Sequence, residues 1–470
     1  MQKPFLLTPL LAAAALALAG CAAVGPDYRA PMAQVESQWS APLPHGGSLQ
    51  QLNTWWQQFN DPTLLALQQA AESDSPTLAV AWGNIELARA TVDSARAGGS
   101  PAVNANASAT RSRQLGTGTT TMRTGGFDGS WELDLLGKVR RNVEAADAQL
   151  QGRRDDWHDA RVSLAAEAAT YYVQYRACGQ FADAYEQEAA SMAETARATE
   201  SLVRAGLSPG NDAALAQATQ SSTASALIAQ RAQCEVLVKS LVQLTGLSEA
   251  RLRALLDAGG SALPDAPGLA VEAVPAQVVQ QRPDVAARER DLAAASASIG
   301  VATAQLYPSL SISGSIGLTA SGGASLTTWS LGPSLSLPLF DGGARQAGVA
   351  SARASYEIAY AQWRDAVRGA TAEVEKALVQ LDETSRRAQQ AERATLAYRR
   401  YLEGAQAELR AGTICLLTYE EARRQALNAQ LQWIGLQRDR VVYWIALYKA
   451  VGGGWQAGDA AAIAPPASRP

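Results

Sequence analysis

The chain has 470 residues, of which 47% are hydrophobic and 18% are charged, and its formal net charge is −4. A length of this order allows about three domains, although long helices break that rule. Lysines and arginines form no basic stripe, which argues against nucleic-acid binding. Two distant histidines, His45 and His158, argue against a histidine-based metal or catalytic site.

The first residues have the pattern of a bacterial lipoprotein leader. Lys3 precedes a short apolar run at 5–19, which ends in Leu18-Ala19-Gly20-Cys21 and resembles a lipobox. The run is too short to span a bilayer comfortably. We therefore expect a signal peptide at 1–20 and an acylated N-terminus at Cys21. The alternative is an ordinary cleavage site beside a chance cysteine.

The residue after the cysteine bears on the destination of the chain. In lipoproteins of this type an aspartate there usually means retention in the inner membrane, so Ala22 favours the outer membrane. One acyl chain anchors weakly, and stable attachment needs more chains or another membrane element. No later segment has roughly eighteen consecutive apolar residues, so no transmembrane helix is expected.

The chain contains an internal repeat, because helix breakers return at an offset of 206 or 207 positions. The recurring landmarks are Ser75-Pro76-Thr77 with Arg282-Pro283-Asp284, Pro101 with Pro308, Ala205-Gly206-Leu207 with Ala411-Gly412-Thr413, and Thr245-Gly246 with Val451-Gly452. We predict two tandem repeats, at 62–246 and 275–452. The remaining segments are an N-terminal extension at 21–61, a linker at 247–274 and a tail at 453–470.

Each repeat predicts helices too long for an ordinary globular domain. Residues 138–204 and 345–410 contain no proline and are rich in strong helix formers, so each would run about 100 Å. Shorter helices at 76–97 with 211–245, and at 283–305 with 419–451, would sum to roughly 85 Å per pair. Two short helices stacked end to end could therefore lie beside one long helix, which indicates coiled-coil or tunnel packing.

Strands interrupt the helices in each repeat, at about 101–113 and 124–135, and again at about 307–319 and 328–340. In the clearest case Leu310, Ile312 and Ile316 alternate with serines. Period-two alternation over about ten residues is typical of transmembrane strands between lipid and a watery lumen. A half-buried soluble sheet would show the same period.

Aromatic residues at the strand ends favour the membrane interpretation. Trp131, Tyr307 and Phe340 would lie at one edge and Trp329 at the other, as in interfacial girdles. The polar segments 114–123 and 320–327 would form the outer turns. Four strands cannot close a barrel, for which the known minimum is about eight, and a membrane tolerates no open edges. A symmetric trimer with twelve strands and twelve helical columns is the simplest solution.

Several motifs resemble the outer-membrane factor family (TolC/OprM-like), in particular its NodT-type lipoprotein branch. These motifs are the start Cys21 to Tyr28, Trp55-Trp56 with Phe59-Asn60-Asp61-Pro62, Ser130 to Lys138, Gln281-Arg282-Pro283-Asp284 through Tyr307-Pro308, and Leu447 to Trp455. The resemblance implies an α+β membrane protein, a trimeric twelve-stranded β-barrel continuous with a twelve-helix periplasmic tunnel. It also implies passive efflux of small molecules delivered by an inner-membrane pump through a periplasmic adaptor.

The resemblance also implies roles for the ends of the two helical hairpins, at about 204–211 and 410–418. Gly206, Leu207, Ser208, Gly412 and Thr413 would contact the adaptor, and the alternative is plain helix caps without a partner. Leu416, Leu417 and Thr418 would form the periplasmic gate.

The gate departs from the family pattern in one respect. Relatives commonly carry aspartate near position 418, where this chain has Thr418, so an acidic ring is doubtful there. Asp212 could substitute for it, or could simply favour a helix start.

Three cysteines remain besides Cys21. If the first hairpin folds at Gly206, facing positions sum to about 412, and Cys178 with Cys234 meet that condition. We predict a disulfide between them, which an oxidising periplasm permits; two buried reduced thiols are the alternative. Cys415 would be a lone thiol near the mouth, structural and unreactive.

The sequence offers no phosphate-binding loop, metal cluster or nucleophile–histidine pair, so we expect neither an enzyme nor a cofactor. Two other functions stay open. One is the outer-membrane duct of a type I protein secretion system, and the other is a lipid-tethered periplasmic coiled-coil scaffold. The expected location is the outer membrane, with the chain reaching into the periplasm, and the cargo is not determined.

Overall fold

A computed structural model describes residues 23–33, 35–36, 38–42, 49–114, 118–265, 279 and 281–455. The expected leader, Cys21, the last third of the expected linker and most of the expected tail lie outside these ranges. The chain divides into two compact units. The first holds residues up to Met32, Gly83–Asp156 and Asp284–Ala366, and the second holds Ala33–Trp82, Trp157–Pro283 and residues from Val367 on.

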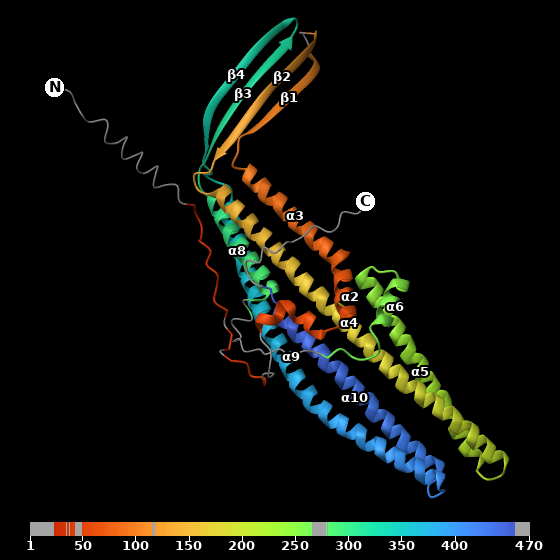
Figure 1. Ribbon diagram of the computed structural model, residues 1–470. Helices are drawn as coiled ribbons and strands as arrows, with labels where there is room; N and C mark the ends of the chain where they lie inside the picture. Colours follow the sequence, from red (N-terminus) through yellow and green to blue (C-terminus); the bar gives the residue numbers. More distant parts are fainter. Residues whose placement is uncertain are drawn as a thin grey trace. The chain divides into compact units, whose positions relative to one another are not determined.

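The first unit contains one antiparallel sheet in the order β1-β2-β3-β4 (Figure 1). The strands are β1 (Ala102–Gln114), β2 (Gly118–Leu133), β3 (Ser309–Ser321) and β4 (Ala324–Ser336). β1 and β2 come from the first repeat and β3 and β4 from the second, so the pairing of β2 with β3 joins the repeats.

The register gives the sheet two chemically different faces, because directly paired residues share a face. One cross-strand row is Ala105, Phe127, Ile316 and Trp329, and the adjacent row is Asn104, Asp128, Ser315 and Ser330. In the second row Asn104 Nδ2 donates to Asp128 Oδ2 at 3.2 Å, and the hydroxyls of Ser315 and Ser330 lie 3.0 Å apart. We call these the apolar face and the polar face.

The β3–β4 hairpin is tighter than the sequence indicated. The expected loop at 320–327 is mostly strand, and the turn consists of Gly322 and Gly323, whose φ angles are +60° and +89°. Two consecutive residues with positive φ suit the two-residue turns of twisted hairpins. Serine and threonine beside the glycines suggested a loop in the sequence. These residues also fit extended backbone, and in the structure they pair across β3 and β4.

Four helices complete the first unit, in whole or in part. They are α3 (Pro76–Ala97), α4 (Lys138–Arg204), α8 (Pro283–Ala304) and α9 (Ala344–Arg410). Buried alanines from α4 and α8 pack together, namely Ala145, Ala148, Ala293, Ala294 and Ala297. Arg96 on α3 pairs with Asp147 on α4 at 3.2 Å. The long helix expected at 138–204 is confirmed, and the one expected at 345–410 begins one residue earlier.

The second unit consists of two antiparallel helical hairpins and a smaller layer of short helices. α4 continues into α5 (Gly210–Thr245), and α9 continues into α10 (Leu416–Ala450) (Figure 1). η1 (Leu49–Phe59), α2 (Pro62–Ser73) and α6 (Glu249–Ala258) are the short helices.

The core of the second unit is built around the paired tryptophans. Trp55 is fully buried and stacks on Tyr448 at 4.8 Å between ring centroids. Asp61 caps α2, because its Oδ1 accepts the backbone N–H groups of Thr63 and Leu64, and its Oδ2 accepts the Tyr172 hydroxyl at 2.7 Å. The motif that supports the family resemblance therefore has a structural role.

Among the described residues, no helix has both the length and the hydropathy required to cross a membrane.

Candidate functional site

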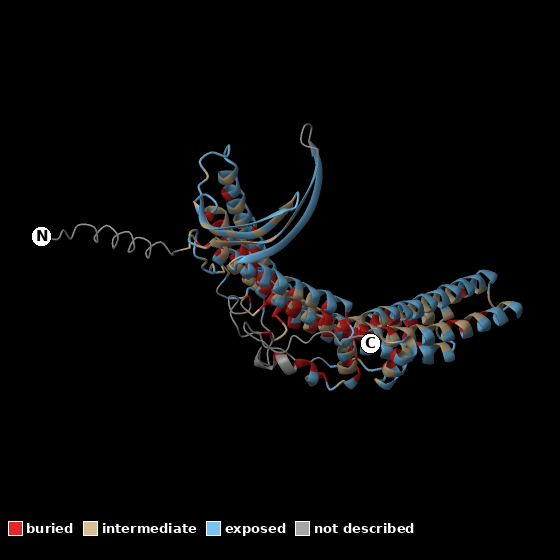
Figure 2. Cartoon of the chain, turned by 90° about the horizontal axis from the view of Figure 1, so that it is seen from above, coloured by how far each residue is buried: buried red, intermediate tan, exposed pale blue. Residues whose placement is uncertain are grey.

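Large side chains on the apolar face of the sheet are exposed in the single chain, and Figure 2 shows much of the sheet coloured as exposed. Phe127, Trp329 and Leu331 are 59%, 76% and 73% exposed. Exposed apolar surface of this kind marks an interaction site. The outermost strands β1 and β4 also have one unpaired edge each within the four-stranded sheet, and such edges pair with another chain unless they are protected.

The aromatic residues predicted for the sheet ends fall in different places. Trp131 lies near the helix-proximal end of β2 and donates its indole N–H to the Gly99 carbonyl at 2.9 Å. Tyr307 and Phe340 lie just outside β3 and β4, and Phe340 is 93% exposed. Trp329 is not at a strand end, because β4 already begins at Ala324 and pairs Trp329 with Ile316.

Both hairpins end their long helix in the same backbone arrangement. Gly206 and Gly412 each have φ +73°. Leu207 N–H donates to Leu202 at 2.9 Å, and Thr413 N–H donates to the equivalent carbonyl of the second hairpin at 3.0 Å. This is the Schellman cap, which requires a left-handed residue and favours glycine. The cap explains both glycines, and it leaves Leu207 75% exposed at the end of the hairpin.

The residues expected to form the gate lie in the first turn of α10, which begins at Leu416 and not at Tyr419 as expected. Leu417 is 64% exposed. Cys415 precedes the helix, and its Sγ lies 3.3 Å from Thr418 Oγ1. Hydrogen bonding to the Thr418 side chain lowers the pKa of the Cys415 thiol. The thiol is exposed, so the expectation of an unreactive structural cysteine is not supported.

A buried ion-pair cluster links the two hairpins of the second unit. Arg423 on α10, 6% exposed, lies 3.3 Å from Glu188 on α4 and 2.5 Å from Glu420. Its Nε atom has no aligned hydrogen bond in this arrangement, although it is at ion-pair distance from Glu188. Thr195 on α4 donates to Glu420 at 2.8 Å. Sequence reasoning missed this cluster, because Arg423 differs in no visible way from Arg424, its exposed neighbour.

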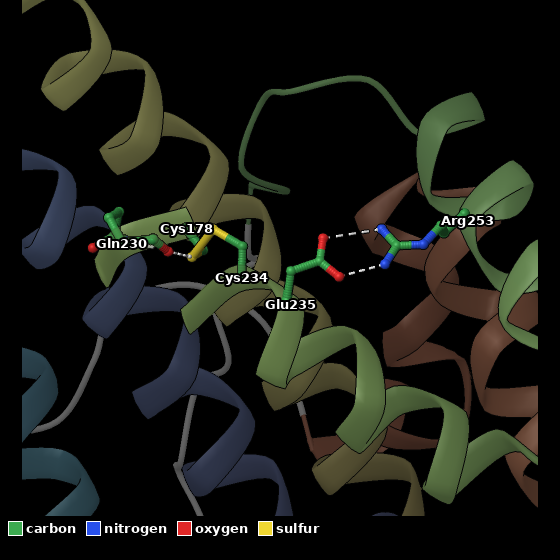
Figure 3. Close-up of a disulfide and its surroundings, with 5 residues drawn as sticks. All are labelled: Cys178, Gln230, Cys234, Glu235 and Arg253. Carbon is green, nitrogen blue, oxygen red and sulfur yellow. Dashed lines mark hydrogen bonds and ion pairs between the residues drawn. A yellow bond between two sulfur atoms is a disulfide. The ribbon is translucent and has the colours of Figure 1, made fainter. Parts of the chain in front are cut away.

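Cys178 on α4 and Cys234 on α5 form a disulfide in the structure (Figure 3). The side-chain amide of Gln230 donates to Cys178 Sγ at 3.0 Å. Directly after Cys234, Glu235 pairs with Arg253 of α6, and Arg253 also contacts Glu249 at 2.7 Å. The disulfide thus joins α4 and α5 at the level where α6 is tied to them.

The segment that follows the lipobox is held on the first unit by Arg141. This buried side chain donates to the Val24 carbonyl at 3.2 Å and to Asp27 at 2.7 Å. Gly25 and Gly300 make the close approach possible, because a Cβ on Gly25 would lie 2.4 Å from Gly300 Cα. The motif around Gly25 was noted in the sequence, but its contact with α8 depends on tertiary packing.

A half-buried aspartate on α4 in the first unit predicts a pH dependence. Burial raises the pKa of Asp155 to about 7, aided by Asp156 and Glu289 and opposed by Arg290. From about pH 4, the usual pKa of the group, to about pH 7, the folded chain holds a proton that the unfolded chain has released. Stability should therefore fall as pH rises through this window.

Replacing Asp155 by asparagine should remove that loss. At pH 8 the free energy of unfolding of the variant should exceed that of the parent by on the order of 2 kcal/mol after allowance for solvent screening. The variant should therefore unfold at a higher temperature at pH 8, and the two unfolding temperatures should converge near pH 4. Thermal unfolding of both proteins between pH 4 and pH 8 measures the effect. Parallel curves across the range would rule out Asp155 as the cause.

No group of three or more potential metal ligands occurs in the part of the chain that the structure describes.

Comparison with known proteins gives consistent matches over nearly the whole chain. The family model described as outer membrane efflux protein matches residues 67–247 and 274–453. Nodulation protein T of Rhizobium leguminosarum bv. trifolii is 30% identical over 452 residues, covering 94% of this chain and 96% of the relative. The toluene efflux pump outer membrane protein TtgI of Pseudomonas putida is 27% identical, covering 94% and 97%.

The solved structures show the same fold. The outer-membrane channel OprN superposes with a TM-score of 0.79 at 30% identity, covering 92% of this chain and 99% of the channel. The four-stranded sheet and the two long hairpins are therefore the protomer fold of TolC-like outer-membrane channels.

Proposed function

This chain belongs to the outer membrane efflux protein family, and from that premise we propose that three copies form the outer-membrane duct of a tripartite efflux pump. The observation that carries the proposal is the sheet. It has four strands, two unpaired edges and one uncovered apolar face. Pairing β1 of one copy with β4 of the next gives twelve strands, which satisfies every edge and turns the apolar face toward lipid.

The polar face then lines the lumen. Its side chains are mostly small hydroxyls and amides, together with Asp128 and Glu132. Such a wall can hydrogen-bond to solutes as water does, but it offers them no tight binding site. This suits passive conduction of many solutes. The energy for transport would come from an inner-membrane pump. The cargo we propose is small molecules of the kind named for TtgI, such as toluene.

The exposed ends of the hairpins are the proposed contact with the periplasmic adaptor. Leu207 is exposed beyond a complete helix cap, so capping accounts for Gly206 but not for an uncovered leucine. Gly206, Ser208, Gly412 and Thr413 belong to the same proposed surface. The first turn of α10, with Leu416, Leu417 and Thr418, is the proposed gate.

Lipid attachment at Cys21 is the proposed second anchor. The barrel would be the first, and together they satisfy the need for two membrane elements. Because Arg141 holds Val24 and Asp27 on the first unit, a lipid on Cys21 would be kept close to the helices of that unit.

Replacing Cys21 by serine should abolish incorporation of labelled palmitate while the barrel still inserts. Labelling in growing cells, followed by immunoprecipitation, measures this directly. Cys415→Ser is the matched control and should label like the parent. Unchanged labelling of Cys21→Ser would contradict the acylation site.

Deleting the gene from its host tests the function. The deletion strain should become more sensitive to toluene and should accumulate more of a fluorescent pump substrate, and the wild-type gene should restore both. A protein that fractionates with the inner membrane, or a deletion without effect on any pump substrate, would contradict the proposal.

A further inference from the structure

Three arginines gather on the apolar face of the sheet, close to the β1–β2 turn. Arg123 on β2 is paired with Ala109 and Ala320, and Arg111 and Arg113 on β1 are paired with Thr121 and Thr119. All three arginines are exposed. They share the parity of Phe127 and Val103, so they stand on the same face as the large apolar side chains.

The register brings the three side chains within reach of a single ligand. Arg111 and Arg113 are two residues apart on one strand, a separation of about 7 Å. Arg123 is the diagonal neighbour of Arg111, at roughly 7–8 Å between Cα atoms. Flexible side chains from a triangle of this size can converge on one anionic group.

Among the residues that the structure describes, no carboxylate forms an ion pair with this arginine triangle. The sequence has no Asp or Glu from 102 to 127 or from 309 to 340, and none stands on the apolar face of the described strands. Asp128 and Glu132 belong to the polar face, nearer the helices. Like charges on neighbouring strand positions are unfavourable, so the cluster calls for an anion from outside the chain.

The position of the triangle along the strands identifies the kind of anion. From Leu133, near the helix-proximal end of the apolar face, to Arg123 is about ten residues, or roughly 34 Å of strand. A strand tilted by about 40° spans a height near 25 Å over that length, which matches the apolar band of outer-membrane barrels. Arg123 therefore lies at the outer rim of the band, with Arg111 and Arg113 just beyond it.

We propose that Arg111, Arg113 and Arg123 bind the phosphate groups of a lipid headgroup in the outer leaflet of the outer membrane. This inference rests on the proposed function, because it requires the apolar face to contact lipid. Guanidinium groups bind phosphate with paired, charge-assisted hydrogen bonds, while Phe127, Ile316 and Leu318 below them contact the acyl chains. The ligand class is a lipid with phosphate monoesters at the level of the band edge.

The test uses the purified full-length protein, freed of lipid in detergent and kept as its oligomer. It is titrated with bis-phosphorylated lipid A, with the same lipid after enzymatic removal of its phosphates, and with inorganic phosphate. Native mass spectrometry counts bound lipid, and the dissociation temperature of the oligomer reports stabilisation. We expect bound lipid and a raised dissociation temperature only with the phosphorylated lipid.

The variant Arg111→Gln/Arg113→Gln/Arg123→Gln should bind the phosphorylated lipid at least about tenfold more weakly, because three charge-assisted contacts are lost. The control Arg197→Gln/Arg393→Gln/Arg399→Gln removes the same charge from exposed helix positions and should bind like the parent. Replacing the three strand arginines by lysine should give an intermediate loss, since lysine keeps the charge without the paired geometry.

Equal binding by the glutamine variant would overturn the inference, as would equal stabilisation by the dephosphorylated lipid or by inorganic phosphate. The proposed function fails separately, if the parent protein is absent from the outer membrane or is monomeric. If the protein is an intact outer-membrane oligomer but binds the lipid equally well with and without the three arginines, only the proposed lipid site is refuted.

Discussion

Replacing Arg423 by alanine should destabilise the second unit by about 3–5 kcal/mol, because it leaves two largely covered carboxylates without a cation. Glu188 and Glu420 have side chains only 12% and 17% exposed, and Arg423 is their shared partner. Burial already raises the pKa of Glu188, and Arg423 opposes that rise. The measurement is thermal unfolding of the purified variant at pH 7.5.

The loss should shrink as pH falls, because the uncompensated carboxyls can then take up protons in the folded state. Arg424→Ala is the matched control. Arg424 is 67% exposed and pairs with the exposed Glu421, so its removal should cost less than about 1 kcal/mol. The triple variant Arg423→Met/Glu188→Gln/Glu420→Gln should recover much of the stability, since no buried charge remains. An Arg423→Ala variant as stable as Arg424→Ala would contradict the assignment.

A functional consequence follows as a hypothesis. Arg423 joins α10 to α4, and α10 carries the proposed gate residues, so its loss should loosen the gate. Cells that express Arg423→Ala should admit a large antibiotic that the intact outer membrane excludes. Exclusion equal to that of the parent would show that this cluster stabilises the hairpins without holding the gate.

Replacing both Cys178 and Cys234 by alanine should lower stability by about 2–4 kcal/mol, because the cross-link closes a long loop in the unfolded chain. The two cysteines are 56 positions apart. Treating the parent with a reductant under native conditions should reproduce the loss, and the double variant should not respond to the reductant. The dissociation and unfolding temperatures, with and without reductant, measure the effect.

Cys415→Ser is the control for that experiment, because Cys415 is an exposed free thiol outside the disulfide. It should match the parent in both conditions. Mass spectrometry of protein alkylated before and after reduction gives an independent readout, with two further thiols expected only after reduction. Three alkylated thiols on the unreduced mature chain, together with no effect of the double replacement, would contradict a disulfide in the cell.

The long helices were predictable because their signals are local. A proline-free run rich in helix formers, such as 138–204, ends where Gly206 supplies the left-handed residue that a cap requires. The same regularity allowed the pairing of Cys178 with Cys234 to be inferred from the position of one turn. Strand ends were less predictable, because serine, threonine and glycine at 320–327 suit both a loop and a strand.

The buried charges could not be predicted from the sequence. The chain has 40 lysines and arginines, and only tertiary packing distinguishes Arg141 and Arg423 from the solvated majority. The sequence shows arginines at 111, 113 and 123, but only the register of β1 with β2 places them on a common face. Local sequence patterns therefore predict the helices and strands. Which polar residues form buried ion pairs or a shared cluster depends on the contacts between those helices and strands.

Disulfide trapping between the outermost strands tests the trimeric barrel most directly. In a Cys415→Ser background, Asn104→Cys on β1 is combined in turn with Ser330→Cys, Gly332→Cys or Ser334→Cys on β4, all on the polar face. We predict that one pair reaches disulfide distance between neighbouring copies, and that oxidation of outer membranes yields covalent dimers and trimers and nothing larger. No covalent product from any pair, or a series that continues beyond three, would contradict a closed barrel of three chains.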